Sequence, residues 1–252
     1  MKTLIISLFV ALTLSAFGKT HKTDLLIIGD SQNGGYWAKD YFGNHFQDCL
    51  TKNNQTFVSY ARGGTQFDHW LNMGNLDHIE TVYRDATTPQ KLMGKEADIT
   101  HKRLGSLIKL HAPARVAVFF GDNLVSMQDF QIRLQVEKTI NMLHQSGIYN
   151  GQCIFITPTY EMQIGTKRNV PMKNFRNTLR VNMAIKEAVE ERCLVLDGLE
   201  LMKNSPLLLK DQTLQRRPTP GLSGCDGAAV NDNIHYCGQA AAEFARKVCE
   251  LI

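Results

Sequence analysis

Short apolar runs alternate with longer segments of helical periodicity along this chain, and this alternation limits the folds that it can adopt. The apolar runs are bounded by turn residues and predict buried strands at 24–29, 56–60, 115–121, 153–157 and 193–197. The longer segments predict helices at 36–52, 100–111, 127–146, 172–191 and 238–251. Because strand and helix alternate, we predict a three-layer α/β/α sandwich, in which helices cover both faces of a mainly parallel five-stranded sheet.

The rest of the sequence does not divide the chain into further units. We find no internal repeat, low-complexity tract or flexible linker, and we expect a single domain over residues 19–252. The stretches 72–97 and 159–171 are expected to be loops. The helix at 127–146 is expected to begin after Ser126, because a serine hydroxyl suits the N-cap position.

Residues 1–18 have the composition of a secretory signal peptide. Lys2 precedes an apolar run at 4–14, and small residues follow where a signal peptidase would cut. The apolar run is shorter than the ~20 residues needed to span a bilayer, and no cysteine follows it closely to carry a lipid. We therefore predict cleavage after residue 18 and a mature, soluble monomer in the periplasm or the medium, without stable membrane insertion.

The charge and the cysteines narrow the class of protein further. The formal net charge of +4 falls to +3 without the signal peptide, which is too small to indicate a nucleic-acid partner. All six cysteines lie in the predicted mature part, where an oxidising compartment favours three disulfides. The predicted layout favours Cys49–Cys249, Cys153–Cys193 and Cys225–Cys237, while the sequence alone leaves other connectivities open. No zinc-type spacing is present, so we expect no metal and no cofactor.

Polar residues and glycines follow the first three predicted strands, at 29–31, 62–64 and 121–123. In an open parallel sheet the C-terminal ends of the strands meet at one edge, and ligands bind there. Ser31 ends the first strand and leads toward a helix, whose N-terminus would favour developing negative charge, so Ser31 is a candidate nucleophile. The alternative is that Ser31 only caps that helix.

A serine nucleophile needs a base and a third group that orients the base. Asp232 and His235 stand three residues apart before the last predicted helix and suit these two roles, although they could also be an incidental pair in a solvent-facing loop. The candidate oxyanion donors are the backbone N–H of Ser31, that of Gly63 or Gly64, and the side-chain amide of Asn123. A turn glycine or a capping asparagine would explain the same residues.

Together these four segments resemble the conserved blocks of the SGNH/GDSL hydrolase superfamily. Those blocks are Gly-Asp-Ser, a glycine after the second strand, Gly-x-Asn and Asp-x-x-His, found here in the same order at 29–31, 63–64, 121–123 and 232–235. The resemblance runs from about residue 24 to the C-terminus. It implies a flavodoxin-like fold and acyl transfer to water, with a triad of Ser31, Asp232 and His235. It also implies an oxyanion hole formed by Ser31, Gly63 and Asn123.

Two positions depart from the pattern of that superfamily without removing a catalytic group. Gln32 stands where the family has leucine, and Gly238 follows His235 more closely than is usual. The chain also lacks the Gly-x-Ser-x-Gly elbow of the α/β-hydrolase fold, which separates it from that class of serine hydrolase.

The expected substrate is an acylated carbohydrate or another ester. We predict a secreted esterase that removes short acyl groups, O-acetyl in the first place, from a cell-wall or extracellular carbohydrate. Gly64, Trp37 and Trp70 are candidate substrate contacts, with core packing as the alternative for both tryptophans. The other hypotheses are a lipase, lysophospholipase or thioesterase of the same superfamily, or a carbohydrate-binding module that keeps the fold without turnover.

Overall fold

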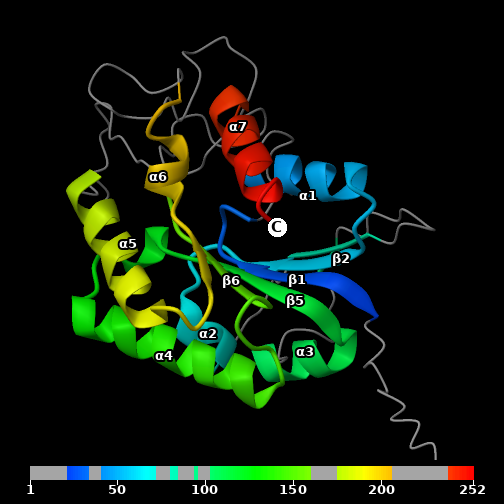
Figure 1. The fold of residues 1–252 in the computed structure, drawn as a ribbon, viewed down its shortest axis with the longest axis horizontal. Helices are drawn as coiled ribbons and strands as arrows, with labels where there is room; N and C mark the ends of the chain where they lie inside the picture. Colours follow the sequence, from blue (N-terminus) through cyan, green and yellow to red (C-terminus); the bar gives the residue numbers. More distant parts are fainter. Residues whose placement is uncertain are drawn as a thin grey trace, which may run out of the picture.

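The computed structural model describes residues 22–33, 41–71, 80–84, 94–95, 103–159, 175–205 and 238–252. The predicted signal peptide, residues 1–18, lies outside these ranges. Within them the chain forms the expected α/β/α sandwich, with a central sheet between two layers of helices (Figure 1). Among these residues, no helix combines the length and the apolar character that crossing a membrane requires.

In the described part of the chain, seven strands form one sheet in the order β4-β3-β2-β1-β5-β6-β7. The parallel strands are β1 (Thr23–Gly29), β2 (Phe57–Ala61), β5 (Pro113–Phe119), β6 (Cys153–Ile156) and β7 (Leu194–Leu196). They are the five strands that the apolar runs predict. Two further strands, β3 (Glu80–Arg84) and β4 (Gly94–Lys95), extend the sheet beyond β2 in antiparallel direction.

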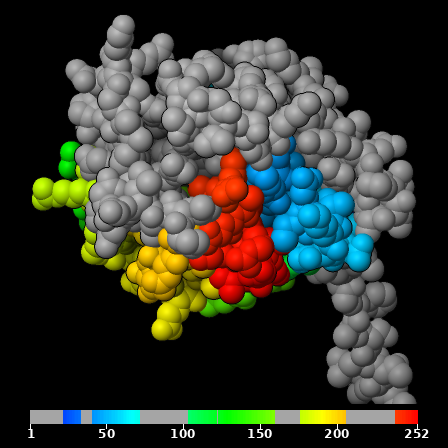
Figure 2. Space-filling view, turned by 90° about the horizontal axis from the view of Figure 1, so that it is seen from above, coloured from blue at the N-terminus to red at the C-terminus, as the bar shows by residue number. Residues whose placement is uncertain are grey.

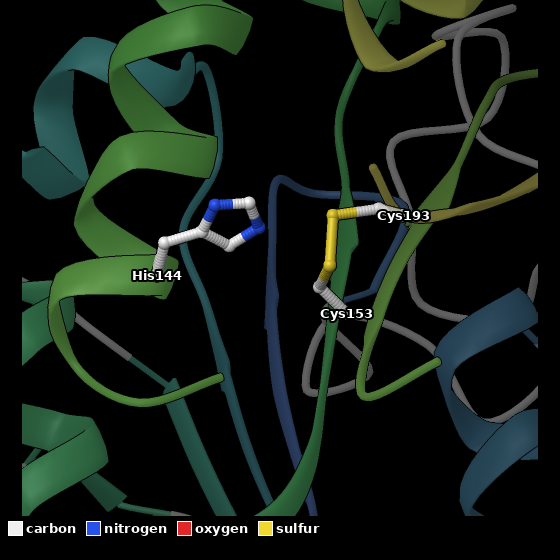
Figure 3. A group of neighbouring side chains, drawn as sticks. All are labelled: His144, Cys153 and Cys193. Atoms are coloured by element: carbon white, nitrogen blue, oxygen red, sulfur yellow. A yellow bond between two sulfur atoms is a disulfide. The ribbon is translucent and has the colours of Figure 1, made fainter. Parts of the chain in front are cut away.

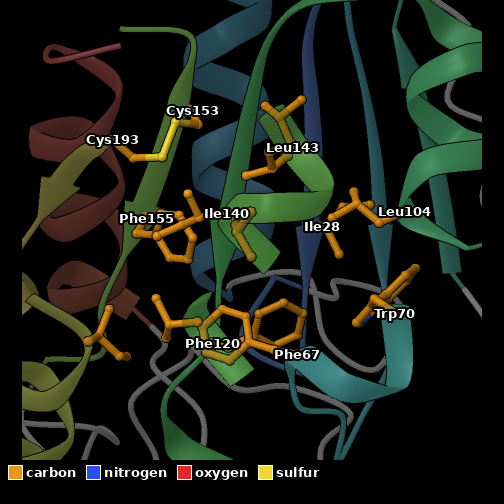
Figure 4. Close-up of a cluster of buried hydrophobic side chains, with 14 of the residues drawn as sticks. Ile28, Phe67, Trp70, Leu104, Phe120, Ile140, Leu143, Cys153, Phe155 and Cys193 are labelled. Atoms are coloured by element: carbon orange, nitrogen blue, oxygen red, sulfur yellow. A yellow bond between two sulfur atoms is a disulfide. The ribbon is translucent and has the colours of Figure 1, made fainter. Parts of the chain in front are cut away.

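Helices cover the two faces of the sheet unequally (Figure 1). One face carries α2 (Phe67–Leu71), α3 (Leu104–His111), α4 (Asp129–Gln145) and α5 (Phe175–Val189), and the other carries α1 (Phe42–Lys52), α6 (Gly198–Met202) and α7 (Gly238–Cys249). Alternate residues of β1 supply the two cores: Leu26 and Ile28 face the first layer, and Leu25 and Ile27 face the second. Figure 4 shows the core under the first layer.

The elements differ at several places from those expected from the sequence. The stretch 72–97 is not only a loop, because β3 and β4 lie within it. Helix α1 begins at Phe42 rather than at residue 36, and residues 34–40 lie outside the described part. Helix α4 is capped by Gln128 and not by Ser126, because the chain first makes a turn in which Met127 N–H donates to Leu124 O at 2.9 Å.

Two of the three predicted disulfides are present. Cys49–Cys249 joins α1 to α7, which lie side by side on one face (Figure 2), and it links positions 200 residues apart in the sequence. Cys153–Cys193 joins the start of β6 to the residue before β7, across 40 residues. The third predicted pair, Cys225–Cys237, lies outside the described residues. Both observed disulfides therefore connect the last third of the chain to earlier elements.

A paired carboxylate and guanidinium on the α4 layer allow a prediction about pH. Arg192 donates to both carboxylate oxygens of Glu137, at 2.7 and 2.8 Å, and these hydrogen bonds hold the pKa of Glu137 below its usual value. Because this pKa is lower in the folded than in the unfolded protein, the ionised carboxylate stabilises the fold at pH values above the ordinary glutamate pKa. This stabilisation is lost as the pH falls through the lowered pKa. Because both side chains are partly exposed, we expect Glu137→Gln to cost at most about 1 kcal/mol of unfolding free energy at pH 7.

Urea unfolding at several pH values checks this expectation. The difference between wild type and Glu137→Gln should shrink as the pH falls below the ordinary value of about 4.5. The control is Glu187→Gln, which removes an exposed ion pair that has a single hydrogen bond, between Glu187 and Arg133. This variant should change the unfolding free energy less than Glu137→Gln does. A difference that stayed constant down to the acid transition would contradict the role of the Glu137 charge.

Candidate active site

The order of the parallel strands fixes where a site can form. Numbered along the chain, the five parallel strands lie in the order 2-1-3-4-5, so the direction of the crossovers reverses between β1 and β5. Open α/β sheets bind ligands at this switch point, outside the C-terminal ends of the two strands. The segments beginning at Asp30 and Gly121 emerge there, and the segment after β2 emerges beside them.

Ser31 lies in a tight turn directly after β1. Asn33 N–H donates to Asp30 O at 3.2 Å, which closes the turn, and the Ser31 residue is only 7% exposed. Gly43 N–H in the first turn of α1 donates to Gln32 O at 3.1 Å, so the Ser31 turn is held against the start of that helix. The seat predicted for Ser31, after a strand and near a helix N-terminus, is therefore present, although α1 starts later than expected.

The buried carboxylate of Asp30 joins the β1 turn to the β5 loop. Its Oδ1 accepts from Gln32 N–H at 2.9 Å, and its Oδ2 accepts from the Asn123 amide at 3.3 Å. Asp30 is 1% exposed, so the two hydrogen bonds form in a protected environment where an unpaired charge would be costly. Asp30 therefore ties the turn that carries Ser31 to the segment that carries Asn123.

Gly63 and Gly64 lie in an exposed turn at the same edge of the sheet. The turn follows β2, and the N–H of the preceding residue, Arg62, donates to Gly29 O at 3.2 Å, two positions before Ser31. Gly64 has a φ of +73°, a conformation that glycine adopts without strain, and a Cβ there would meet nothing within 4 Å. Both glycines thus remain available to a ligand at this edge.

Asn123 is held by the segment that follows these glycines. Its amide nitrogen donates to Thr65 O at 3.2 Å as well as to Asp30, so both of its N–H groups have acceptors. Gln66 donates from its amide nitrogen to Asn123 O at 2.8 Å. The three segments after β1, β2 and β5, which the sequence marked separately, therefore form one hydrogen-bonded unit around the switch point.

The remaining predicted site residues are three that the structure does not describe and Trp70. Asp232, His235 and Trp37 lie outside the described residues. Trp70 is described, and its prediction as a substrate contact is wrong: the residue is 1% exposed and packs in the core between the sheet and α2 (Figure 4). Its indole N–H donates to the Thr65 hydroxyl at 3.4 Å, so Trp70 supports the loop from beneath and offers no face to a sugar.

Sequence reasoning missed Asp30, Thr65 and Gln66 as members of the site. Asp30 was visible as an acid directly after a buried strand, which is an unusual place for a charge without a partner. Thr65 and Gln66 carry no comparable signal, because their contacts to Asn123 span more than 50 residues of sequence.

One group of potential metal ligands occurs among the described residues, at a distance from this edge along β6. It consists of His144, Cys153 and Cys193 (Figure 3). The two sulfur atoms are joined in a disulfide, so neither is the thiolate that a metal would require. This group is therefore part of the core and not a candidate metal centre.

The glycine that precedes Asn123 by two residues allows a test of how tightly the site is built. A Cβ on Gly121 would lie 2.2 Å from Cδ of Pro158, a rigid ring in the loop after β6. We expect Gly121→Ala to destabilise the protein by about 1–3 kcal/mol, since one of the two loops must move, and to lower kcat for ester hydrolysis through the shift of Asn123.

Urea unfolding and p-nitrophenyl acetate kinetics measure these two effects. Gly151→Ala is the control, because Gly151 has open space around a Cβ and no link to the site, while its positive φ of +79° makes the substitution costly for folding. The control should lose stability without losing kcat. Equal kcat values for Gly121→Ala and wild type would show that Asn123 does not depend on this contact.

Comparisons with known proteins agree on the fold. No protein-family model and no curated protein matches the chain. A GDSL-like lipase from Bacteroides thetaiotaomicron is similar in structure, with a TM-score of 0.55 and 10% identity over 91% of this chain and 87% of the other. A carbohydrate acetylesterase from Sinorhizobium meliloti matches with a TM-score of 0.54 and 10% identity, over 91% and 98% of the two chains. An aryl esterase from M. smegmatis matches with a TM-score of 0.52 and 13% identity, over 91% of this chain and 97% of the other. At these identities the likeness establishes the fold, and the fold predicted from the sequence is confirmed.

Proposed function

We propose that this chain, which has the fold of the SGNH/GDSL hydrolases, is a secreted serine esterase that removes short acyl groups, O-acetyl above all, from carbohydrate. The observation that carries the proposal is the hydrogen-bonded unit at the switch point, in which Asp30 links the Ser31 turn to Asn123 at 3.3 Å. An ester hydrolase needs a nucleophile and oxyanion donors beside each other, and this unit brings both candidates to one edge.

In the proposed reaction Ser31 Oγ attacks the acyl carbon of the ester while His235 takes its proton. Asp232 orients the imidazole and stabilises the imidazolium that forms. The tetrahedral oxyanion accepts hydrogen bonds from the backbone N–H groups of Ser31 and Gly63 and from the Asn123 amide. His235 then returns the proton to the leaving alcohol, and water releases the acyl group from Ser31 by the reverse sequence of steps.

The environment of the Asn123 amide suits this use. Its N–H groups donate to Asp30 Oδ2 and Thr65 O at 3.3 and 3.2 Å, which are at the long end for such hydrogen bonds. An oxyanion is a stronger acceptor than the Thr65 carbonyl, so one N–H can exchange partners as the negative charge develops. The donor therefore gains more in the transition state than in the free enzyme, which is what raises kcat.

Two observations support the choice of substrate and compartment. The carbohydrate acetylesterase from Sinorhizobium meliloti shares the fold over 98% of its own chain. The two disulfides favour an oxidising compartment, in agreement with the predicted signal peptide. These observations support our proposal that the protein acts in the periplasm or outside the cell.

Hydrolysis of p-nitrophenyl esters of increasing chain length tests the proposal, together with acetate release from acetylated polysaccharides. We expect the highest kcat/KM for acetyl esters and measurable acetate from at least one acetylated glycan. A preference for long acyl chains would replace the proposal with the lipase or thioesterase hypothesis. Glycan binding without any turnover would replace it with the binding-module hypothesis.

A further inference from the structure

We propose that Gln66 is a positioning residue, which holds Asn123 as an oxyanion donor and thereby sets kcat. This inference rests on the proposed function and deepens it. Gln66 lies between the exposed glycine turn and α2, and it donates from its amide nitrogen to Asn123 O at 2.8 Å. This hydrogen bond is shorter than either of those made by the Asn123 amide itself.

Gln66 can hold Asn123 in place because its own backbone is fixed. Its N–H donates to Nδ1 of His69 at 2.9 Å, an arrangement like the reciprocal caps that begin helices. The next residue, Phe67, is 1% exposed and packs against Phe120 with a ring separation of 4.9 Å. The Gln66 side chain therefore extends from a rigid helix start, and Phe120 belongs to the segment that leads to Asn123.

The side chain of Asn123 alone is not enough to fix its own position. Asp30 and Thr65 hold only the amide, through hydrogen bonds of 3.3 and 3.2 Å, and the proposed reaction takes one of those N–H groups away. At that moment the Gln66 contact still holds the main chain of Asn123. Since the contact is to the backbone carbonyl, it does not compete with the oxyanion for the amide.

Loss of this contact should affect catalysis more than folding. Gln66 and Asn123 are both half-buried, so water can replace the donor at the Asn123 carbonyl in a variant. A misplaced donor, by contrast, lowers the rate of the chemical step directly. We expect Gln66→Met to lower kcat for p-nitrophenyl acetate by about 10- to 100-fold, with KM within about twofold of wild type.

The chain offers a matched control at the opposite edge of the sheet. Gln152 donates from its amide nitrogen to Ala114 O at 3.3 Å, which is the same type of bond, between a half-buried glutamine and a backbone carbonyl. The Oε1 of Gln152 also accepts from Tyr149 N–H at 3.2 Å, so Gln152→Met should shift the melting temperature at least as much as Gln66→Met and leave kcat unchanged. A second variant, Gln66→Glu, keeps the shape, removes the donor and should lower kcat at least as much as Gln66→Met.

A double-mutant cycle with Asn123→Ala decides whether Gln66 acts through Asn123. Asn123→Ala alone should lower kcat by about 10²- to 10³-fold, and adding Gln66→Met should lower it further by less than about twofold. Wild-type kcat in Gln66→Met, or fully additive losses in the double variant, would overturn the positioning role while leaving the proposed function intact. A folded wild type that neither turns over esters nor reacts with a fluorophosphonate would overturn the proposed function and this inference with it.

Discussion

Ser31→Ala is expected to lower kcat for p-nitrophenyl acetate by at least about 10⁴-fold, the largest effect of any single substitution in this protein. The hydroxyl is the only group in the proposed reaction that forms a covalent bond to the substrate. The remaining oxyanion donors can still polarise the ester, so a residual rate above that in water should persist. Initial-rate kinetics on the purified variant measure the loss.

A working triad also predicts that the losses in kcat are not additive when its members are substituted together. If Ser31, Asp232 and His235 act as one unit, then His235→Ala should cost nearly as much as Ser31→Ala, and the double variant should cost no more than either. Ser106→Ala, on the exposed side of α3, is a serine control that should keep full activity. Additive losses, or a nearly active His235→Ala variant, would mean that another group serves as the base.

Removing the Cys49–Cys249 disulfide is expected to have the largest effect on stability. In the chain-entropy account, a cross-link between positions 200 residues apart stabilises the folded state by roughly 5 kcal/mol. The link across 40 residues, Cys153–Cys193, gives roughly 4 kcal/mol. The double variants Cys49→Ala/Cys249→Ala and Cys153→Ala/Cys193→Ala should therefore unfold at lower urea concentrations, with the first pair more affected.

Loss of the Cys49–Cys249 disulfide should also make esterase activity less resistant to heat. Cys249 is the last residue of α7, which packs against α1. The turn that contains Ser31 is bound to α1 by the hydrogen bond from Gly43 N–H to Gln32 O. Loss of this disulfide should therefore lower the temperature at which esterase activity disappears along with the unfolding temperature, without changing kcat at 25 °C. A larger loss of stability from the Cys153–Cys193 pair would contradict the chain-entropy explanation.

The parallel core of the fold was predictable from sequence because most of its strands, among them β1, β2 and β6, are buried on both faces. β1 and β5 are largely continuous apolar runs in the sequence. The helices each bury one side, so their apolar residues recur at helical spacing. β3 was missed because its five residues, Glu80–Arg84, form no continuous apolar run and include a charged residue at each end. α2 and α6 were missed because five residues are too few to show a helical period.

Some residues of the site could likewise be predicted from the local sequence, and others could not. Ser31 and Asn123 were predictable because each follows a buried strand, and a parallel sheet brings such positions to one edge. The contacts of Asp30 and Gln66 join segments that are distant in sequence, so a local pattern could at most mark Asp30 as an unusually placed acid and gave no sign of Gln66. Trp70 was misassigned because a tryptophan after a strand can face either the ligand or the core, and only packing decides between them.

Whether Ser31 is an activated nucleophile can be measured by reaction of the oxidised mature protein with a fluorophosphonate, followed by intact-mass spectrometry and peptide mapping. This reagent reports an activated serine whatever the natural ester is. We expect one adduct per chain, mapped to Ser31 and absent from the Ser31→Ala variant. An unmodified wild-type protein, or an adduct at another serine, would contradict the claim that the switch point of this sheet holds a working nucleophile.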